Sequence, residues 1–423
     1  MLDMKRIRKE QAQVEAALKK RMDNVDLTPL VQIDEERRAY IQQVEKLKMD
    51  RNTFSKQIGM LKGDTDASDQ LNNMKSYIQN VNEQITQIET KLKHCEEQQH
   101  DMIVQLPNIP EDDVPAGGKE NNQVMKQWGE KPTFDFEWKD HMALAKTLHI
   151  IDYERGAKLG GSGHWMYASQ GAQLEWALLN FFIDTHIKNG YQFILPPHIL
   201  NEQCGYSAGQ FPKFKEDVFY TDDRQHFLLP TSETALVNVH RDEIVQLETL
   251  PTKYVAYTPC YRREAGSYGA NERGMIRGHQ FNKVELVQLT TPQQSDEALN
   301  EMLHTAEHLV QQLELHYQVT KLAAKDCSHS MAKTFDVEVW IPSMNEYKEV
   351  SSASNAKDYQ ARRGNIRFKE EGNATQYVHT LNASALATSR LVPALLEQHQ
   401  QQDGSVKVPK ALHKWLGSTL LSH

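Results

Sequence analysis

The sequence predicts an α+β protein, in which an antiparallel helical coiled-coil arm precedes a domain built on an antiparallel β-sheet flanked by helices. Apolar residues recur with heptad spacing in two long runs before residue 105. After residue 123, runs with strand character follow one another through polar loops, whereas strands alternating with helices would have indicated a parallel sheet. A chain of 423 residues is long enough for two such domains.

The heptad runs predict a helical hairpin. The first run covers residues 40–61 and is interrupted at Arg51, and the second covers 71–102 with only Gln99 off the pattern. The polar stretch KGDTDASD, which contains Gly63, lies between the runs and predicts a turn. Two helices of about 28 to 35 residues would make an arm on the order of 45 Å long.

Basic side chains are in excess on the first of these helices. Between residues 37 and 62 only Glu45 and Asp50 are acidic, against the basic residues Arg37, Arg38, Lys46, Lys48, Arg51, Lys56 and Lys62. A solvated coiled-coil face with ion pairs along the helix is the usual meaning of such a pattern. The excess charge also suits the phosphates of RNA or DNA, and the arm alone does not decide between these readings.

A segment rich in proline and glycine, LPNIPEDDVPAGGKENN, follows the hairpin. Proline ends a helix, and polar Pro- and Gly-containing segments commonly connect domains. The sequence therefore predicts a helical hairpin domain at residues 1–105, a linker at 106–122 and a second domain at 123–423.

The second domain begins with mixed patterns. A helix is predicted over 172–188, ending at Asn189-Gly190, and the short apolar strand YQFIL follows it until Pro196 and Pro197. The other predicted elements are strands at 253–263, 276–289 and 335–341 and helices at 295–315 and 383–399. No GxxxxGKS loop and no GxGxxG unit occurs, so neither nucleotide-binding scaffold of that kind is supported.

Composition and charge exclude several classes of protein. The net charge of −9 argues against a globally basic nucleic-acid binder but permits a local basic surface. No apolar run approaches the roughly 20 residues of a membrane span, and the charged start MLDMKRIRKEQ predicts no secretory signal. The four cysteines are too scattered for a disulfide framework or a zinc pattern, so we expect a cytoplasmic protein with no membrane contact.

One string carries a resemblance that composition does not. TPCYRREAGSYGANERGMIRGHQFNKVELVQL, residues 258–289, resembles motif 2 of the class II aminoacyl-tRNA synthetases and specifically of the seryl-tRNA synthetases. The segments GQFPKF, LPTSETALVNVHRDEI, AKTFDVEVWIP, EVSSASN, YQARRGNIRF and HTLNASALATSR resemble the same family in the same order. The chain is thus identified as a diverged, bacterial-type member, whose sheet would be the class II catalytic sheet and whose hairpin would bind tRNA.

The resemblance implies two catalytic arginines and a set of ATP contacts. Arg262 would clamp both the α-phosphate of ATP and the serine carboxylate, because the reaction must hold two anions in line. Arg390 would lie near the γ-phosphate, and Arg277 would also reach the phosphates. Glu264 would contact adenine and Phe281 would stack on it. The alternatives are an Arg262–Glu264 ion pair, a solvent-facing Arg277, a core Phe281 and an ordinary helix position for Arg390.

The resemblance also implies a magnesium site and a serine pocket. Glu349 and Ser352 would hold Mg²⁺, which prefers oxygen ligands and shares them with phosphates; the same two residues would contact ATP. The serine contacts would be Thr231, Glu233, Arg262, Glu285 and Ser384. Selecting serine over alanine requires polar groups that remain unpaired when the hydroxyl is missing, and a structural ion pair is the alternative role for Glu285.

Several positions depart from the family pattern. Ala383, Ala385 and Ser389 replace glycines of motif 3, and Ala270, Asn271 and Glu272 replace usual residues of the motif 2 loop. If the added methyl groups line the pocket, bulky seryl-adenylate mimics should bind more weakly, and restoring the glycines should reverse this. If the glycines only eased helix packing, the alanines would stabilise that helix by up to about 1 kcal/mol each.

The expected function is serine–tRNA ligase activity: L-serine, ATP and tRNA(Ser) would give seryl-tRNA(Ser), AMP and pyrophosphate. We expect a homodimer formed through the helix and strand before Pro196 and Pro197, which resemble motif 1. Deleting 34–104 should spare adenylate formation and remove aminoacylation. The alternatives are a duplicate that keeps serine activation for antimetabolite resistance or biosynthetic seryl supply, and a non-catalytic RNA-binding paralog.

Overall fold

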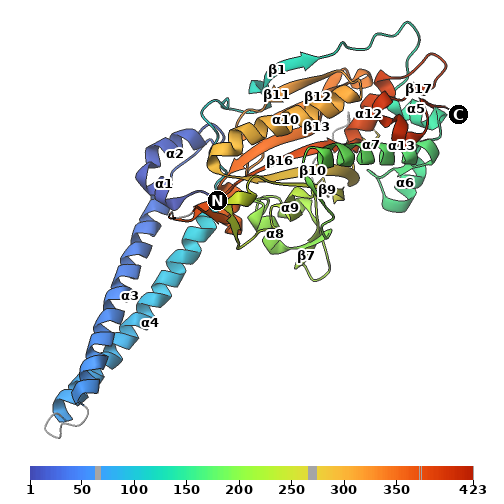
Figure 1. The fold of residues 1–423 in the computed structure, drawn as a ribbon. Helices are drawn as coiled ribbons and strands as arrows, with labels where there is room; N and C mark the ends of the chain where they lie inside the picture. The colour runs from blue at the N-terminus through green and yellow to red at the C-terminus, as the bar shows by residue number, and fades with distance from the viewer. Residues whose placement is uncertain (62–67, 265–273, 371, 373, 423) are drawn as a thin grey trace. The chain divides into compact units, whose positions relative to one another are not determined.

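The computed structural model describes residues 1–61, 68–264, 274–370, 372 and 374–422 (Figure 1). It separates into two compact units, which are described here one at a time. The smaller unit contains Leu2–Ala16 and Asn24–Leu106, and the larger contains Met1, Ala17–Asp23 and Pro107–His423.

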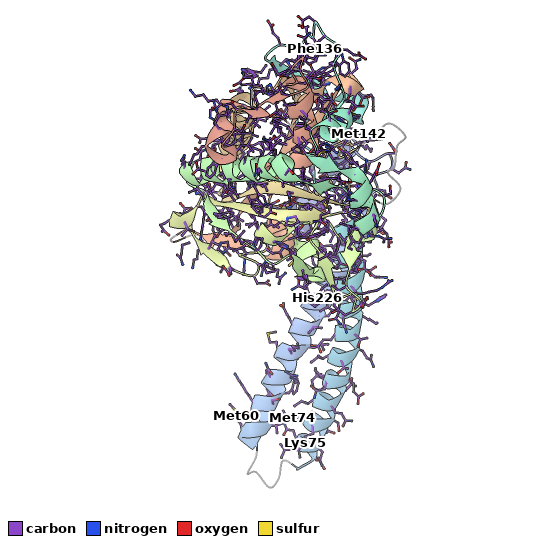
Figure 2. All side chains as sticks on the ribbon, turned by 90° about the vertical axis from the view of Figure 1, so that its right-hand side faces the viewer. Met60, Met74, Lys75, Phe136, Met142 and His226 are labelled. Atoms are coloured by element: carbon purple, nitrogen blue, oxygen red, sulfur yellow. The ribbon has the colours of Figure 1, made fainter. Side chains whose placement is uncertain are left out.

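The smaller unit is dominated by an antiparallel helical hairpin, as the heptads predicted. Helices α3 (Thr28–Leu61) and α4 (Ser68–Gln105) run side by side, and Figure 2 shows Met60 and Met74 at the same end of the pair. Lys48 of α3 pairs with Glu89 of α4 at 2.7 Å. Val44, Val81, Ile85 and Cys95 of the predicted seam are buried. Most of the predicted turn, including Gly63, lies outside the described residues.

Two short helices, α1 (Met4–Lys9) and α2 (Gln11–Leu18), precede the hairpin. The buried Asp34 carboxylate of α3 accepts hydrogen bonds from Arg8 and, at 3.0 Å, from Gln99 of α4. The base of the hairpin is therefore held by polar contacts within this unit, and the more distant part by the apolar seam.

The larger unit is built on an eight-stranded sheet in the described part of the chain, with strand order β1-β11-β12-β13-β16-β10-β9-β4. All neighbours are antiparallel except β4 and β9, which are parallel. The strands are β1 Gln123–Trp128, β4 Gln192–Ile194, β9 Thr252–Tyr261, β10 Gln280–Thr290, β11 Tyr317–Lys321, β12 Lys333–Ile341, β13 Glu346–Lys357 and β16 His379–Ala387. The predicted antiparallel sheet is confirmed.

One face of this sheet is covered by helices α5 (His141–Thr147), α7 (Ser169–Lys188), α10 (Ser295–Gln312) and α12 (Thr388–Gln398) (Figure 1). Side chains alternate along a strand, so Val337 and Val339 of β12 enter the helix-covered core while Asp336 and Glu338 face the other side. The second face is thereby left for polar side chains. A smaller apolar cluster around Leu236 and Phe368 closes the β9 end of the domain.

Shorter elements surround this framework. The helices are α6 Tyr153–Gly160, α8 Glu202–Ser207, α9 Glu233–Leu236, α11 Tyr359–Gly364 and α13 His413–Leu416. The strands are β2 Ile151–Asp152, β3 Met166–Tyr167, β5 Ile199–Asn201, β6 Phe219–Tyr220, β7 His226–Leu228, β8 Ile244–Gln246, β14 Arg367–Lys369, β15 Gln376–Tyr377, β17 Val406–Lys407 and β18 Leu420–Leu421. None of the helices in the described ranges has the length and apolar character needed to cross a membrane.

Two segments differ from their sequence-based description. The predicted helix 383–399 begins only at Thr388, because residues up to Ala387 pair as strand β16 with β10 and β13. Alanine and leucine favour helix, but pairing in the middle of a sheet overrides that preference. Residues 107–122 are an ordered part of the larger unit: the Asn108 amide donates to the His329 carbonyl at 2.8 Å.

Candidate functional site

The face of the sheet opposite the helices carries a cavity of about 400 Å³. Its walls come from β10, β12, β13 and β16 and from residues just outside the strands. The lining includes Thr231, Glu233, Arg262, Lys283, Glu285, Ser328, Met331, Asp336, Glu338, Glu349, Ser352, Asn382, Ser384 and Arg390. Eight residues predicted for the site therefore gather around one space: Thr231, Glu233, Arg262, Glu285, Glu349, Ser352, Ser384 and Arg390.

A second cavity of about 310 Å³ adjoins the first. Both are lined by Thr231, Glu233 and Arg262, and the second adds Glu264 and Arg277. Arg262 thus lies where the two spaces meet, which suits a residue expected to touch two different anions.

Arg262 follows the last residue of β9 and is held there by its surroundings. Its Nε donates to the Pro230 carbonyl at 3.2 Å, and its guanidinium carbon lies 5.2 Å from the centre of the Phe281 ring. Glu264 has the left-handed backbone angle φ +50°, and its carboxylate accepts from Arg277 Nε at 2.6 Å. Glu264 therefore pairs with Arg277. Arg262 does not form the alternative ion pair with Glu264 in this structure and lies between the cavities.

Phe281 faces the guanidinium of Arg262 and is not among the described residues that line either cavity. The predicted contacts of Ala270, Asn271 and Glu272 lie outside the described residues.

Two neighbouring carboxylates of the larger cavity, those of Glu285 and Glu233, repel each other. Glu285 of β10 lies opposite Ser384 of β16, whose hydroxyl donates to the Glu285 carboxylate at 3.3 Å. Lys283, two residues earlier on the same strand face, forms an ion pair with Glu285. Lys283 is a site residue that the sequence reasoning missed, although its spacing from Glu285 was visible.

Glu233, the first residue of α9, also lines this cavity. It is held by Gln360, whose side-chain amide donates to it at 2.8 Å. Burial and then the negative charge of Glu285 raise the pKa of Glu233 to about 7. A positively charged group between these carboxylates would relieve their repulsion, which makes this corner attractive for an ammonium ion.

An irregularity of β13 places Glu349 and Ser352 on the same face. Residues three apart on a regular strand point to opposite faces, but Glu349 faces Glu338 and Ser352 faces Asp336 in the register with β12. One additional residue of β13 therefore stands between these pairs, as in a β-bulge. Both side chains consequently line the cavity, and Arg390 Nη1 donates to the Glu349 carboxylate at 3.1 Å.

Asp336 is a second residue that the sequence reasoning missed. It is buried beside Glu349 and Ser352, and burial followed by the charge of Glu349 raises its pKa. Its Oδ1 has no hydrogen-bond partner among the described residues. The alternation of Asp336 and Glu338 with valines along β12 was the signal available in the sequence.

These oxygens fit the expected magnesium ion. An unpartnered, buried carboxylate oxygen next to a second carboxylate suits a hard cation. The described residues contain no group of three or more His, Cys, Asp and Glu arranged to hold a metal.

The structure contradicts the expected effect of the alanines in motif 3. Ala383 and Ala385 are on strand β16, not on a helix, and both are fully buried in the core beneath the helices. Ser384, between them, points to the opposite face and lines the cavity. The added methyl groups therefore fill the core and do not narrow the pocket. Ser389 lies on α12 and is not among the described lining residues.

The comparisons with known proteins agree over the whole chain. Residues 1–110 match the family model of the seryl-tRNA synthetase N-terminal domain, and residues 214–399 match the model of the tRNA synthetase class II core domain (G, H, P, S and T). The serine–tRNA ligase 2 of Clostridium acetobutylicum is 57% identical, with 100% of both chains covered. The serine–tRNA ligase of Syntrophobacter fumaroxidans is 44% identical, with 99% of both covered.

Solved structures give the same result. The seryl-tRNA synthetase of Pyrococcus horikoshii, complexed with ATP, matches with a TM-score of 0.92 at 31% identity, covering 100% of this chain and 99% of that one. The cytoplasmic serine–tRNA ligase of Naegleria fowleri, in complex with AMP, matches with a TM-score of 0.86 at 27% identity, covering 98% of this chain and 96% of that one. This chain belongs to the seryl-tRNA synthetase family of class II aminoacyl-tRNA synthetases.

Proposed function

We propose that the chain is a serine–tRNA ligase that activates L-serine with ATP and transfers the seryl group to tRNA(Ser). The observation that carries this proposal is the set of charged side chains around the cavities. Glu233 and Arg262 line both cavities, and the buried Glu285 lines the larger one with them. Such a site can bind the ammonium group of an amino acid through the glutamates and hold the carboxylate of that amino acid next to a phosphate of ATP.

The serine-binding part consists of Thr231, Glu233, Arg262, Glu285 and Ser384. The ammonium group of serine would lie between Glu233 and Glu285, where it lowers the repulsion between them. The serine hydroxyl would reach the Glu285–Ser384 pair, which already forms a hydrogen bond. Alanine would leave these buried polar groups without that partner, and a site of this kind rejects it strongly.

In the first step, a serine carboxylate oxygen forms a bond to the α-phosphorus while the bond from that phosphorus to the leaving pyrophosphate breaks. Arg262 would hold the carboxylate and the α-phosphate in line and offset the growing charge. Arg277 and Arg390 would contact the other phosphates, Glu264 the adenine amino group, and Phe281 the adenine face. In the second step, a terminal ribose hydroxyl of the tRNA attacks the seryl carbonyl carbon, and AMP leaves.

Glu349, Ser352 and Asp336 would hold Mg²⁺ by their oxygens. The bound ion would supply positive charge to the phosphates of ATP. Arg390 would keep Glu349 in place, since its Nη1 donates both to the Glu349 backbone carbonyl and to the side chain, each at 3.1 Å.

The hairpin domain, residues 1–105, would bind tRNA(Ser), and residues 123–423 would carry the chemistry. The basic excess of α3 supports this division, and every proposed ATP and serine contact belongs to the larger unit. We place the enzyme in the cytoplasm, where its three substrates occur; its four cysteines, all free and buried, agree with a reducing compartment.

The test of the activation step is amino-acid-dependent exchange of pyrophosphate into ATP by the purified chain. Serine should support exchange, while alanine and glycine should support less than about 1% of it, because they lack the hydroxyl. Exchange with none of these amino acids would favour the non-catalytic RNA-binding reading. The comparisons do not favour that reading or the duplicate with another role.

Glu233 should give serine activation an acid limb. With a pKa near 7 this carboxyl is increasingly protonated and neutral as the pH falls below 7, and a neutral carboxyl holds an ammonium ion less well. We expect kcat/KM for serine to fall about tenfold per pH unit well below that pKa. In Glu233→Gln the value should be low and nearly constant over this range. An unchanged acid limb in the variant would assign the titration to another group.

The proposed homodimer is supported by exposed apolar side chains on α7 and β5, on edge strand β4 and directly after it. They include Trp176, Phe193, Leu195 and Ile199, of which Leu195 is 69% exposed and Ile199 is 55% exposed. Sedimentation at micromolar concentration should show a dimer, and Leu195→Glu combined with Phe193→Glu should yield a monomer. Leu159→Glu, at an apolar position of α6 that is 80% exposed, is the matched control and should leave the dimer intact. A well-folded wild-type monomer would contradict the proposal.

A further inference from the structure

The chain crosses between the two units at residues 23–24 and again at 106–107. The short stretches beside these crossings, 17–23 and 107–117, both belong to the larger unit. Arg21 and Asn108, one from each stretch, both bind the loop of residues 323–331 between β11 and β12, where the Pro115 and Gly117 carbonyls also accept from the Ala324 and Lys325 backbone amides. Arg21 lies two residues before Asp23, the last residue of its stretch, and Asn108 directly follows Pro107, the first residue of the other.

The guanidinium of Arg21 binds this loop through backbone carbonyls. Nε donates to Ala324 at 2.9 Å, and Nη1 donates to Met331 at 3.2 Å and His329 at 3.4 Å. Nη2 donates to the carbonyls of Cys327 at 3.3 Å and Ser328 at 3.4 Å. Nη1 also donates to the carbonyl of Asn108 at 2.8 Å. A single planar side chain therefore donates hydrogen bonds to carbonyls along the whole loop.

Asn108 secures the same loop from the other crossing. Its side-chain amide donates to the Ser330 carbonyl at 2.9 Å and to the Ala356 carbonyl of β13 at 2.8 Å. Its backbone amide donates to His329. Because buried carbonyls need donors, Arg21 and Asn108 together stabilise this shape of the loop.

The other side of the loop faces the proposed substrates. Ser328 and Met331 line both cavities, together with Thr231, Glu233 and Arg262. Met331 Sδ accepts from the side-chain amide of Asn382, a cavity residue of β16, at 3.8 Å. The loop bound by Arg21 is therefore a wall of the serine and ATP site.

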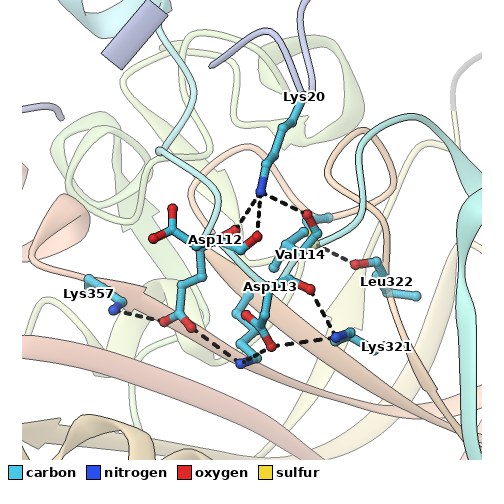
Figure 3. A network of polar contacts seen from close by, with 10 residues as sticks. Lys20, Asp112, Asp113, Val114, Lys321, Leu322 and Lys357 are labelled. Carbon is cyan, nitrogen blue, oxygen red and sulfur yellow. Dashed lines mark hydrogen bonds and ion pairs between the residues drawn. The ribbon is translucent and has the colours of Figure 1, made fainter. Parts of the chain in front are cut away.

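A neighbouring lysine makes a similar contact that does not reach this wall. Figure 3 shows Lys20 Nζ directed at the backbone of the 107–117 stretch, where it donates to the carbonyls of Glu111, Asp112 and Val114. The Glu111 and Asp113 carboxylates continue the network to Lys333 and Lys357 on β12 and β13. Lys20 thus anchors the connecting chain to the sheet, and none of its three partners lines a described cavity.

We propose that Arg21 is a positioning residue for serine activation, which holds loop 323–331 in the shape that places Ser328 and Met331 in the substrate site. This inference rests on the proposed function. According to this inference, the chain segments that lead into the hairpin help to set the geometry of the adenylation site. Arg21 itself touches neither substrate; it acts through the backbone of the loop.

Arg21→Lys tests this directly in the full-length chain. Lysine keeps the charge, but a single ammonium group with three donors cannot reach carbonyls spread from Ala324 to Met331. We expect kcat/KM for serine in pyrophosphate exchange to fall about 10- to 100-fold, as for other small misplacements of a catalytic wall. Lys20→Met is the matched control and should stay within about twofold of wild type. The melting temperatures of the two variants should fall by similar amounts, because both lose carbonyl contacts near the same crossing.

Equal kinetic losses in Arg21→Lys and Lys20→Met, or wild-type kinetics in Arg21→Lys, would overturn the proposal and leave Arg21 with a purely structural role. If Arg21→Lys does not fold, Asn108→Ser decides: it removes two donors to the loop region and should also lower kcat/KM for serine, whereas unchanged kinetics would refute the inference. A wild-type chain without serine-dependent exchange would instead defeat the proposed function, so the two failures are distinguishable.

Discussion

Arg262→Ala should reduce serine-dependent pyrophosphate exchange by about 10³-fold or more. Arg262 is the arginine that lines both cavities among the described residues, and in the proposed reaction it holds both reacting anions. Removing a charged group that orients and neutralises a phosphoryl transfer typically costs 10³- to 10⁵-fold in rate. Arg262→Lys should keep a small part of the activity, because a point charge cannot reproduce a planar two-point contact.

Arg263→Ala is the matched control for this measurement. Arg263 is the next residue, but its Nη1 donates to the Glu216 carbonyl at 3.3 Å and it does not line either substrate cavity in the described structure. We expect its exchange rate to stay within a few fold of wild type. Comparable losses at both positions would show that the loss reflects a disturbed loop and not a contact of Arg262 with the substrates.

Shortening the hairpin should separate the two steps of the reaction. Lys48 and Glu89 are paired across α3 and α4, so residues 49–88 can be replaced by a short Gly-Ser turn without changing the register below it. Aminoacylation of tRNA(Ser) should fall at least about 100-fold through lost phosphate contacts, while serine-dependent exchange should stay within about twofold.

This cut is preferable to the deletion of residues 34–104 that the sequence alone suggested. The larger deletion would remove Asp34 and its hydrogen bonds to Arg8 and Gln99, and with them the packing at the base of the hairpin. If the shorter cut abolishes exchange as well as aminoacylation, the hairpin has a role in adenylate formation that the proposed division of labour does not contain.

The sequence was sufficient to predict elements with a long hydrophobic periodicity and elements whose residues resemble family motifs. The heptads specified α3 and α4 because their spacing repeats over many turns, and the two strands predicted around the motif 2 string correspond to β9 and β10, with Arg262 just after β9 and Glu285 on β10. Helix α12 was predicted too long, because the pairing of Ala383 with Leu286 depends on a strand distant in sequence.

The missed features share a cause, since each arises from contacts between distant segments. Asp336 and Lys283 become site residues only when β12 and β10 are laid into the same sheet. Glu349 and Ser352 share a face because of an irregular register that no local pattern shows. Arg21 reaches its loop across some three hundred residues of sequence, as in its 2.9 Å hydrogen bond to Ala324. The expectation that the alanines of motif 3 narrow the pocket was wrong, because Ala383 and Ser384 lie on a strand, where successive side chains point to opposite faces.

The most direct test of the central claim is attachment of labelled serine to tRNA by the purified chain with ATP and Mg²⁺. The account predicts that a tRNA(Ser) transcript accepts serine to near one equivalent, that threonine and alanine are not attached, and that a tRNA specific for another amino acid accepts nothing. Robust serine-dependent pyrophosphate exchange without any attachment to tRNA(Ser) would contradict it and would point to an enzyme that delivers activated serine to a different acceptor.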